Sequence, residues 1–433
     1  MPKRPPFIVV LALAVVASAS TWFYVNKILI VQQVADAAAH GRPRGNLSDL
    51  YPRWLGAREL LRRGRNPYSA EITGEIQQGY YGRPLDPARI DDPKDQQGFA
   101  YPVYVVFLLA PTIDLPFSAV QMGFRWLLVG LAVASVLLWL RVLGWKPSWG
   151  TMVILIVLAL GWLPMVQGLK LQQLSLLVAA LLAACGACLA GGWLFSAGVL
   201  LALATIKPQL TWPLVLWLLV WAGSDWRSRR RFVFGFGLVM LLLLGGAELV
   251  LPGWWRMFIA AIEQYHRYTQ NQSVPAVMFG SVAGGILGVL SVVACAVCVW
   301  GLREESASTV AFGQATSLVM ALTIFIIPMS ALYNQVLLAP AILALLWIES
   351  AGEPVLPAIR LARAVGGVLL AWPWIATVGL SLAYLWLTPA PPQQLYLMPF
   401  YSSYMVPVFI FGLALLNTWT SQPGLLRDGA PAE

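Results

Sequence analysis

Apolar runs of about 20 residues recur along the chain and are separated by short polar breaks. Because an α-helix of that length crosses a bilayer, the pattern predicts an all-α polytopic membrane protein in which residues 1–433 form one integral domain with about twelve transmembrane helices. The predicted spans are residues 7–31, 117–140, 151–166, 174–190, 194–206, 210–222, 232–251, 281–300, 308–327, 331–348, 361–387 and 395–416.

Two polar stretches are longer than the connections between the other spans. Residues 32–116 contain the apolar piece Tyr101–Ile113, which is too short to cross and is predicted to be an interfacial or re-entrant helix. Residues 252–280 begin with a second amphipathic segment. Lys3 and Arg4 precede the first span, so the positive-inside rule predicts a cytoplasmic amino terminus. An even number of crossings then puts the carboxyl terminus in the cytoplasm and both long loops on the outer face.

The segment Asn46–Tyr68 has the pattern of an arginine-rich helix lying on the membrane surface. Its predicted apolar stripe consists of Leu50, Trp54, Ala57 and Leu61. The arginines predicted to face water and lipid headgroups are Arg53, Arg58, Arg62 and Arg63. At its head, Ser48 or Asp49 could cap the helix, and Asp49 could instead be a catalytic carboxylate. This segment alone leaves both roles open.

Composition supports a membrane protein and argues against a role in binding nucleic acid. The chain is 59% hydrophobic and only 11% charged, with a mean hydropathy of +0.72. Its net charge of +9 is spread over loops and helix ends, which favours contact with anionic lipid. The four cysteines form two CxxC pairs inside apolar runs, where we expect them to pack helices rather than to bind metal.

Several polar residues fall at the predicted outer ends of spans. They are candidates for binding a phosphate group whose lipid tail stays in the bilayer: Lys207, Arg125, His266, Arg58, Gln172, Gln173, Tyr333 and Asn334. Lys207 stands out because it lies between two apolar arms that are short for full crossings. A snorkelling lysine or an interfacial arginine explains such positions without a ligand. Among these cations, the Asp49 carboxylate is expected to stay ionised and able to accept a proton.

An ordered set of short motifs resembles glycosyltransferase family 87, whose members include polyprenyl-phosphate-mannose-dependent mannosyltransferases of the GT-C fold. The motifs are D-x-Y (49–51), G-x-N-P-Y (64–68), F-x-Y-P (99–102), a polar break with glutamine (172–175), A-G-x-L-L-A-L-A-x-x-K-P (197–208) and N-Q-S (271–273). The sequence departs from the family where G-Q-x-N is Gln172–Ser175 and where Y-P-P is Tyr101–Val103. The resemblance implies that Asp49 is the general base.

The resemblance further implies transfer of a sugar, such as mannose, from a polyprenyl-phosphate donor to a hydroxyl of a lipid or glycan acceptor, with inversion at the anomeric carbon. It places the reaction on the outer, periplasmic face of the bacterial inner membrane. Neither a cofactor nor a metal is expected, and Asp91, Asp92 and Asp95 are predicted to form an acidic, solvated turn. A multi-span transporter or lipid flippase is an alternative, as is another GT-C enzyme such as an arabinosyltransferase or a glycan ligase.

Overall fold

The computed structural model describes residues 6–44, 47–328, 331–351, 357–386 and 393–420. In this part of the chain the regular structure is helical and there is no strand, which confirms the all-α prediction. The elements are α1 Phe7–Phe23, η1 Tyr24–Leu29, α2 Ile30–Ala39, α3 Leu50–Arg63, α4 Ala70–Tyr81, α5 Val105–Leu109, η2 Ala110–Thr112, α6 Phe117–Val142, α7 Trp149–Leu160, α8 Leu163–Leu171, α9 Leu174–Ala190, α10 Leu194–Ala204, α11 Pro208–Ser224, α12 Trp226–Val250, α13 Trp254–Thr269, α14 Val274–Phe279, α15 Ser281–Gly301, α16 Val310–Ile326, η3 Leu332–Leu338, α17 Ala339–Ala351, α18 Pro357–Trp386, α19 Gln393–Tyr396, α20 Met398–Ser402 and α21 Met405–Thr420.

Within the described residues, seven helical stretches are long and apolar enough to cross a membrane. An eighth would be the pair α7 and α8, which is bent by 56° at the break between them. The apolar helices α9, α10 and α16 are shorter. The chain is therefore a multi-pass membrane protein, and the count of twelve spans stays a prediction.

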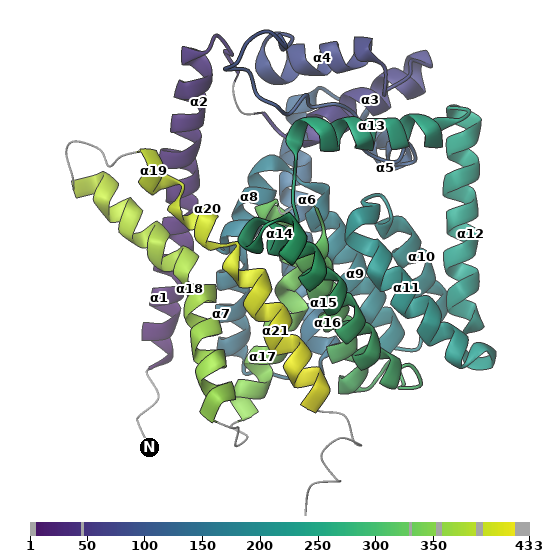
Figure 1. Ribbon diagram of the computed structural model, residues 1–433, viewed down its shortest axis with the longest axis vertical. Helices are drawn as coiled ribbons and strands as arrows, with labels where there is room; N and C mark the ends of the chain where they lie inside the picture. Colours follow the sequence, from purple (N-terminus) through teal and green to yellow (C-terminus); the bar gives the residue numbers. More distant parts are fainter. Residues whose placement is uncertain (1–5, 45–46, 329–330, 352–356, 387–392, 421–433) are drawn as a thin grey trace, which may run out of the picture.

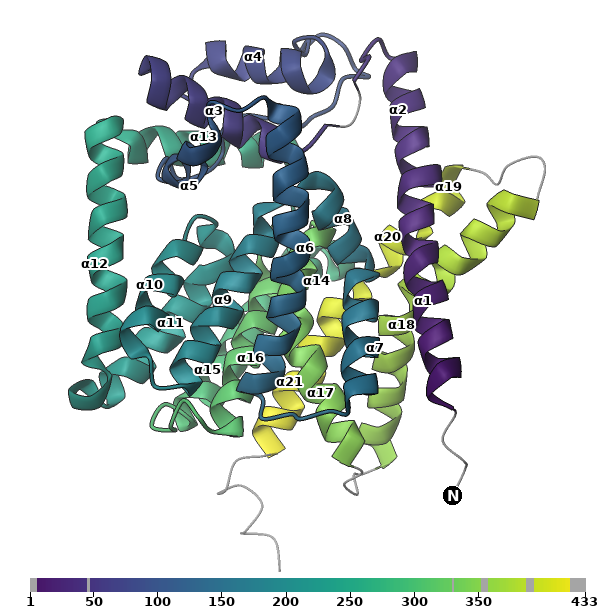
Figure 2. The same ribbon diagram turned by 180° about the vertical axis from the view of Figure 1, so that it is seen from behind.

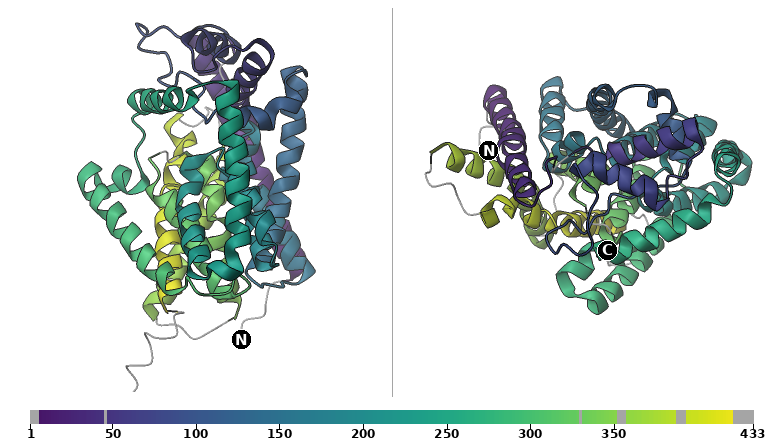
Figure 3. Two further views of the ribbon diagram at one scale, coloured as in Figure 1. Left: turned by 90° about the vertical axis from the view of Figure 1, so that its right-hand side faces the viewer. Right: turned by 90° about the horizontal axis from the view of Figure 1, so that it is seen from above.

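A layer of helices lies across one end of the bundle (Figure 1). It consists of α3, α4 and α5 from the first long loop and α13 from the second, and the view from above in Figure 3 shows α3, α4 and α13 lying over the spans. The first span, α1 to α2, starts at the opposite end of the molecule (Figure 2). The predicted interfacial or re-entrant segment Tyr101–Ile113 contains the short α5 and η2 of this layer. That it does not cross the membrane stays a prediction.

The start and end of helix α3 are set by its capping residues, and its position is set by close packing against Phe99. The Leu50 N–H donates to the Ser48 hydroxyl at 3.1 Å, and Gly64, with φ +65°, ends the helix. The face containing Leu50 and Trp54 is buried, as the apolar stripe predicted. A Cβ on Gly56 would collide with the Phe99 ring, so this glycine lets α3 pack directly on the segment that leads into α5.

The α10–α11 hairpin carries Lys207 to the underside of the α3–α13 layer. Helix α10 packs tightly on α12 because Gly198 has no side chain where the backbone of Phe232 approaches. The Tyr104 hydroxyl donates to the Thr205 carbonyl oxygen at 2.9 Å, which ties the hairpin tip to the first long loop. Helix α12 then rises from the end where α1 begins to the start of α13, so the run Trp226–Arg231 lies at the end opposite the layer (Figure 1).

Candidate active site

A cavity of about 280 Å³ lies between the α3–α13 layer and the ends of the spans beneath it. Asp49, which directly precedes α3, lines the cavity together with Arg53 of α3 and Tyr265 of α13. Gln173 and Lys207 line the wall formed by the spans. Residues that are far apart in sequence therefore meet in one polar chamber.

The Asp49 carboxylate faces this cavity and does not cap α3. Asp49 is the residue before the helix, yet its side chain accepts no hydrogen bond from the first turn, where Ser48 acts instead. The carboxylate accepts one hydrogen bond from the Tyr80 hydroxyl at 3.1 Å and another, short one from the Gln173 amide. Its backbone N–H donates to the Leu171 carbonyl oxygen at 3.0 Å. Of the two roles left open by the sequence, the cap therefore belongs to Ser48.

Burial sets the electrostatics of Asp49. Loss of solvent raises the pKa of its carboxyl above the ordinary value, and this outweighs the opposing effects of Arg53, Tyr80, Gln173 and Lys207. The nearby cations lower this pKa, as expected, but they are not the dominant influence. A carboxylate with a raised pKa is a stronger base, and the chemistry available to it is acceptance of a proton from a hydroxyl placed in the cavity.

Lys207 is held among oxygen acceptors and is only 3% exposed. Its ammonium donates to Gln173 Oε1 at 3.1 Å, to Ser175 Oγ at 2.5 Å and to Asn334 Oδ1 at 3.5 Å. Three acceptors match the three N–H donors of an ammonium group. Gln173 thus accepts from Lys207 and donates to Asp49, which links the lysine to the carboxylate. Burial lowers the pKa of Lys207 to about 7. The Tyr333 ring lies beside this group, with its centroid 5.0 Å from Lys207 Nζ.

Arg53 also belongs to the site, although the sequence pattern predicted that it faces water. Its Nη1 donates to the Asp49 carbonyl oxygen at 2.9 Å, and its guanidinium lies 4.4 Å from the centroid of the Tyr101 ring. Among the described residues, its buried Nε has no hydrogen-bond partner. The sequence did hold a signal that Arg53 belongs to the site: Arg53 follows Asp49 by four residues, a spacing that brings two side chains to the same face of a helix.

A profile of glycosyltransferase family 87 matches residues 99–328, which is 230 of the 433 residues. The chain belongs to this family. The comparisons with curated proteins and with solved structures found no match to the chain. The matched range includes Tyr101, Gln173 and Lys207 of the cavity, whereas Asp49 and Arg53 precede it. Family membership makes the protein a glycosyltransferase. Because Asp49 lies outside the matched range, its candidacy as a functional residue rests on its position in the cavity.

Five of the predicted site residues do not line the cavity of this glycosyltransferase, and one of them, Asn334, instead accepts a hydrogen bond from Lys207. Arg58 lies over the ring of Trp54, and Arg125 is exposed on α6. His266 lines a separate surface hollow. Gln172 is fully buried, and its amide donates to the carbonyl oxygens of residues 169 and 170. With φ +47°, Gln172 forms the turn between α8 and α9, so its place is structural.

The predicted acidic turn was only partly right. Asp92 forms an ion pair with Arg83, whereas Asp95 lines the cavity and accepts hydrogen bonds from the backbone N–H and amide of Gln97. Burial raises the pKa of the Asp95 carboxyl. In the part of the chain that the structure describes, no three His, Cys, Asp or Glu side chains are grouped so that they could hold a metal ion. The four cysteines are free thiols on α9 and α15.

The cavity of the glycosyltransferase has an apolar rim. Trp212 of α11 and Ile262 of α13 both line it, and they are 46% and 44% exposed. In a membrane protein, exposed apolar side chains at this level face lipid. The cavity therefore combines a polar interior with an apolar rim.

Proposed function

We propose that this family 87 glycosyltransferase moves a sugar, in the first instance mannose, from a polyprenyl-phosphate donor to a hydroxyl of a lipid or glycan acceptor. The observation that carries the proposal is the Asp49 carboxylate standing in a cavity whose rim is apolar. A lipid-linked donor needs both features, because its tail stays in the bilayer while its sugar and phosphate enter a polar chamber. The choice of mannose and of a polyprenyl carrier comes from the motif resemblance.

In the proposed reaction, the Asp49 carboxylate serves as the base and the lipid phosphate is the leaving group. Asp49 takes the proton from the acceptor hydroxyl as the acceptor oxygen attacks the anomeric carbon of the donor. The bond between that carbon and the phosphate oxygen breaks, and its electron pair leaves with the lipid phosphate. Attack from the side opposite the phosphate in a single displacement gives inversion. The products are the glycosylated acceptor, the lipid phosphate and a protonated Asp49.

Two cations support the departing phosphate in this proposal. Arg53 lines the cavity and carries a planar guanidinium with several N–H donors, so it suits direct contact with phosphate oxygens. The N–H donors of Lys207 are directed at protein oxygens, so Lys207 acts through its charge and through the position of Gln173. Tyr333 and Asn334 complete the wall around this lysine. No metal or cofactor is part of the proposed reaction.

The orientation in the membrane is also part of the proposal. The run Trp226–Arg231 and the start of α1 share one end of the molecule, and the positive-inside rule makes that end cytoplasmic. Helix α21 runs toward the same end, which favours a cytoplasmic carboxyl terminus (Figure 1). The cavity then lies at the outer, periplasmic face of the bacterial inner membrane.

The test uses the full chain in proteoliposomes that contain a polyprenyl-phosphate mannose and acceptor lipids, with products identified by mass spectrometry. Loss of the general base predicts that Asp49→Asn lowers transfer by about 10²–10⁴-fold. Asp91→Asn is the matched control, because Asp91 is exposed in the same loop and does not line the cavity. Full activity of the Asp49 variant would remove Asp49 from the mechanism.

The same preparation separates the competing functions. Movement of a lipid-linked sugar across the bilayer without a covalent product would favour a transporter or flippase. Transfer from a polyprenyl-phosphate arabinose, or from a diphosphate-linked glycan, in place of mannose would favour an arabinosyltransferase or a glycan ligase.

A further inference from the structure

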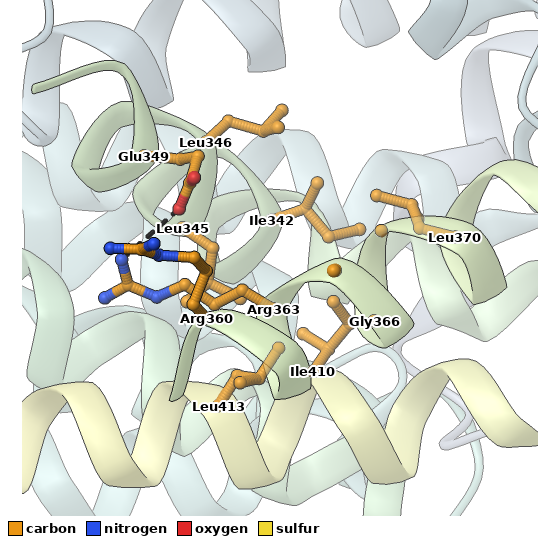
Figure 4. A pocket seen from close by; sticks show the side chains of 12 residues that line it. Ile342, Leu345, Leu346, Glu349, Arg360, Arg363, Gly366, Leu370, Ile410 and Leu413 are labelled. Atoms are coloured by element: carbon orange, nitrogen blue, oxygen red, sulfur yellow. Dashed lines mark hydrogen bonds and ion pairs between the residues drawn. The ribbon is translucent and has the colours of Figure 1, made fainter. Parts of the chain in front are cut away.

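A second cavity lies at the opposite end of the molecule from Asp49, in the angle between α17, α18 and α21 (Figure 4). Its volume is about 280 Å³, and its walls are mostly aliphatic. A third cavity of about 240 Å³ adjoins it and reaches toward Trp162 and Trp374. The two share the lining residues Ile342, Leu346, Gly367 and Leu370, so together they form one apolar trough along α17 and α18.

One end of this trough is charged. Arg360 and Arg363 line it together with Glu349, and Figure 4 shows both guanidinium groups on the same side of the cavity, near Glu349. Arg363 forms an ion pair with Glu349 at 3.3 Å. Among the described residues, Arg360 has neither an ion pair nor a hydrogen bond and is exposed. The rim therefore carries two positive charges against one negative charge, a net charge of +1.

The charged rim lies at the end of the bundle where α1 begins, because α17 ends there and α18 starts there (Figures 1 and 2). Leu346 and Gly367 are exposed beside the trough, so it is open along its side toward the surroundings of the bundle. An open apolar trough with a cationic end has the shape and polarity of a lipid: acyl chain along the helices and anionic headgroup at the arginines.

We propose that the trough binds one anionic glycerophospholipid from the leaflet opposite the active site, with its phosphate at Arg360 and Arg363 and one acyl chain along Gly367 and Leu370. The tail of a polyprenyl donor is a poorer match, because its phosphate has to reach Asp49 at the other end of the molecule. Free phosphate is a poorer match as well, since it would leave the apolar trough unoccupied. The proposal concerns a lipid that is not consumed, so it does not depend on the sugar that the enzyme transfers.

The test measures lipid selectivity by native mass spectrometry of the delipidated full chain, titrated with phosphatidylglycerol or phosphatidylcholine that carry the same acyl chains. One net charge predicts about a fivefold preference of the wild type for phosphatidylglycerol. The double variant Arg360→Gln/Arg363→Gln should lose this preference. The control Arg227→Gln/Arg230→Gln, which removes two exposed arginines outside the trough, should keep it.

Two further variants separate the proposal from a folding defect. Glu349→Gln removes the competing carboxylate, so the preference should rise to roughly thirtyfold, an increase that misfolding does not produce. Gly367→Leu fills the shared part of the trough, where a Cβ meets no atom within 4 Å, and should reduce binding of both lipids at least threefold. Millimolar inorganic phosphate should leave lipid binding unchanged.

Equal binding of the two lipids by the wild type would overturn the proposal, as would a lower preference in Glu349→Gln. Retention of polyprenyl phosphate in place of glycerophospholipid, lost on Gly367→Leu, would assign the trough to the donor tail instead.

Discussion

Replacing Gln173 by leucine tests the link between Asp49 and Lys207. Leucine removes the amide that donates to the Asp49 carboxylate and the oxygen that accepts from Lys207 Nζ at 3.1 Å, while keeping a side chain of similar size. Because the Gln173 hydrogen bond favours the ionised carboxylate, its loss raises the pKa of Asp49 further.

The size of this change follows from the strength of the bond. A hydrogen bond to a charged group contributes about 1.5–3 kcal/mol, and about 1.4 kcal/mol corresponds to one pKa unit. Tyr80, Arg53 and Lys207 still favour the ionised form, so the lower end of the range applies. We expect the pKa of Asp49 to rise by about one unit in the variant.

The assay is the pH dependence of kcat/KM for sugar transfer, whose acidic limb reports the ionisation of the base in the free enzyme. If Asp49 is the general base, as proposed, transfer requires its ionised form, so a higher pKa moves the acidic limb to higher pH, by about one unit. Gln209→Leu is the control, because Gln209 lines the same cavity and has no hydrogen bond to Asp49 in the described part of the chain. An acidic limb that stays in place, or moves to lower pH, in Gln173→Leu would refute the link.

Three further predictions follow from the same cavity. Arg53→Gln should lower kcat for transfer by about 10²-fold through loss of a charge at the phosphate, whereas Arg58→Gln, on the same helix but over Trp54, should keep wild-type kcat. Asp49→Asn should raise the Tm in detergent at pH 7. Burial raises the folded-state pKa of Asp49 above the unfolded value, so the ionised carboxylate costs stability at pH values above the unfolded pKa, and a lowered Tm would contradict this sign. Treatment with EDTA should leave transfer rates unchanged, and restoration of lost activity by a divalent cation would show that a metal takes part.

The sequence predicted the fold class and singled out Asp49 and Lys207 as candidate site residues, because each of these inferences depends on a local pattern. Runs of apolar residues predict helices that cross a bilayer, and a lysine between two short apolar arms is conspicuous. The Asp49–Gln173 contact joins residues 124 positions apart, and only the packing of α3 over the start of α9 brings them together.

The sequence does not show how each helix is rotated about its own axis, and this rotation decides which side chains reach the cavity. Arg53 was predicted to face water because α3 was treated as a helix with one buried stripe, whereas the structure buries residues around much of its circumference. Arg125 and His266 were chosen because the predicted topology places both of them on the outer face. Helix α6 is apolar nearly all round, so its sequence does not indicate which side faces the protein, and Arg125 lies on the exposed side.

The apolar rim at Trp212 and Ile262 has a kinetic consequence. A donor that enters sideways from the bilayer is encountered in two dimensions, so the concentration that governs the rate is its mole fraction among the lipids. Adding inert phospholipid to each vesicle should then slow the enzyme, while diluting the vesicles in buffer should not. The cell could thus adjust the rate through the lipid composition of the membrane, without any change in the amount of enzyme.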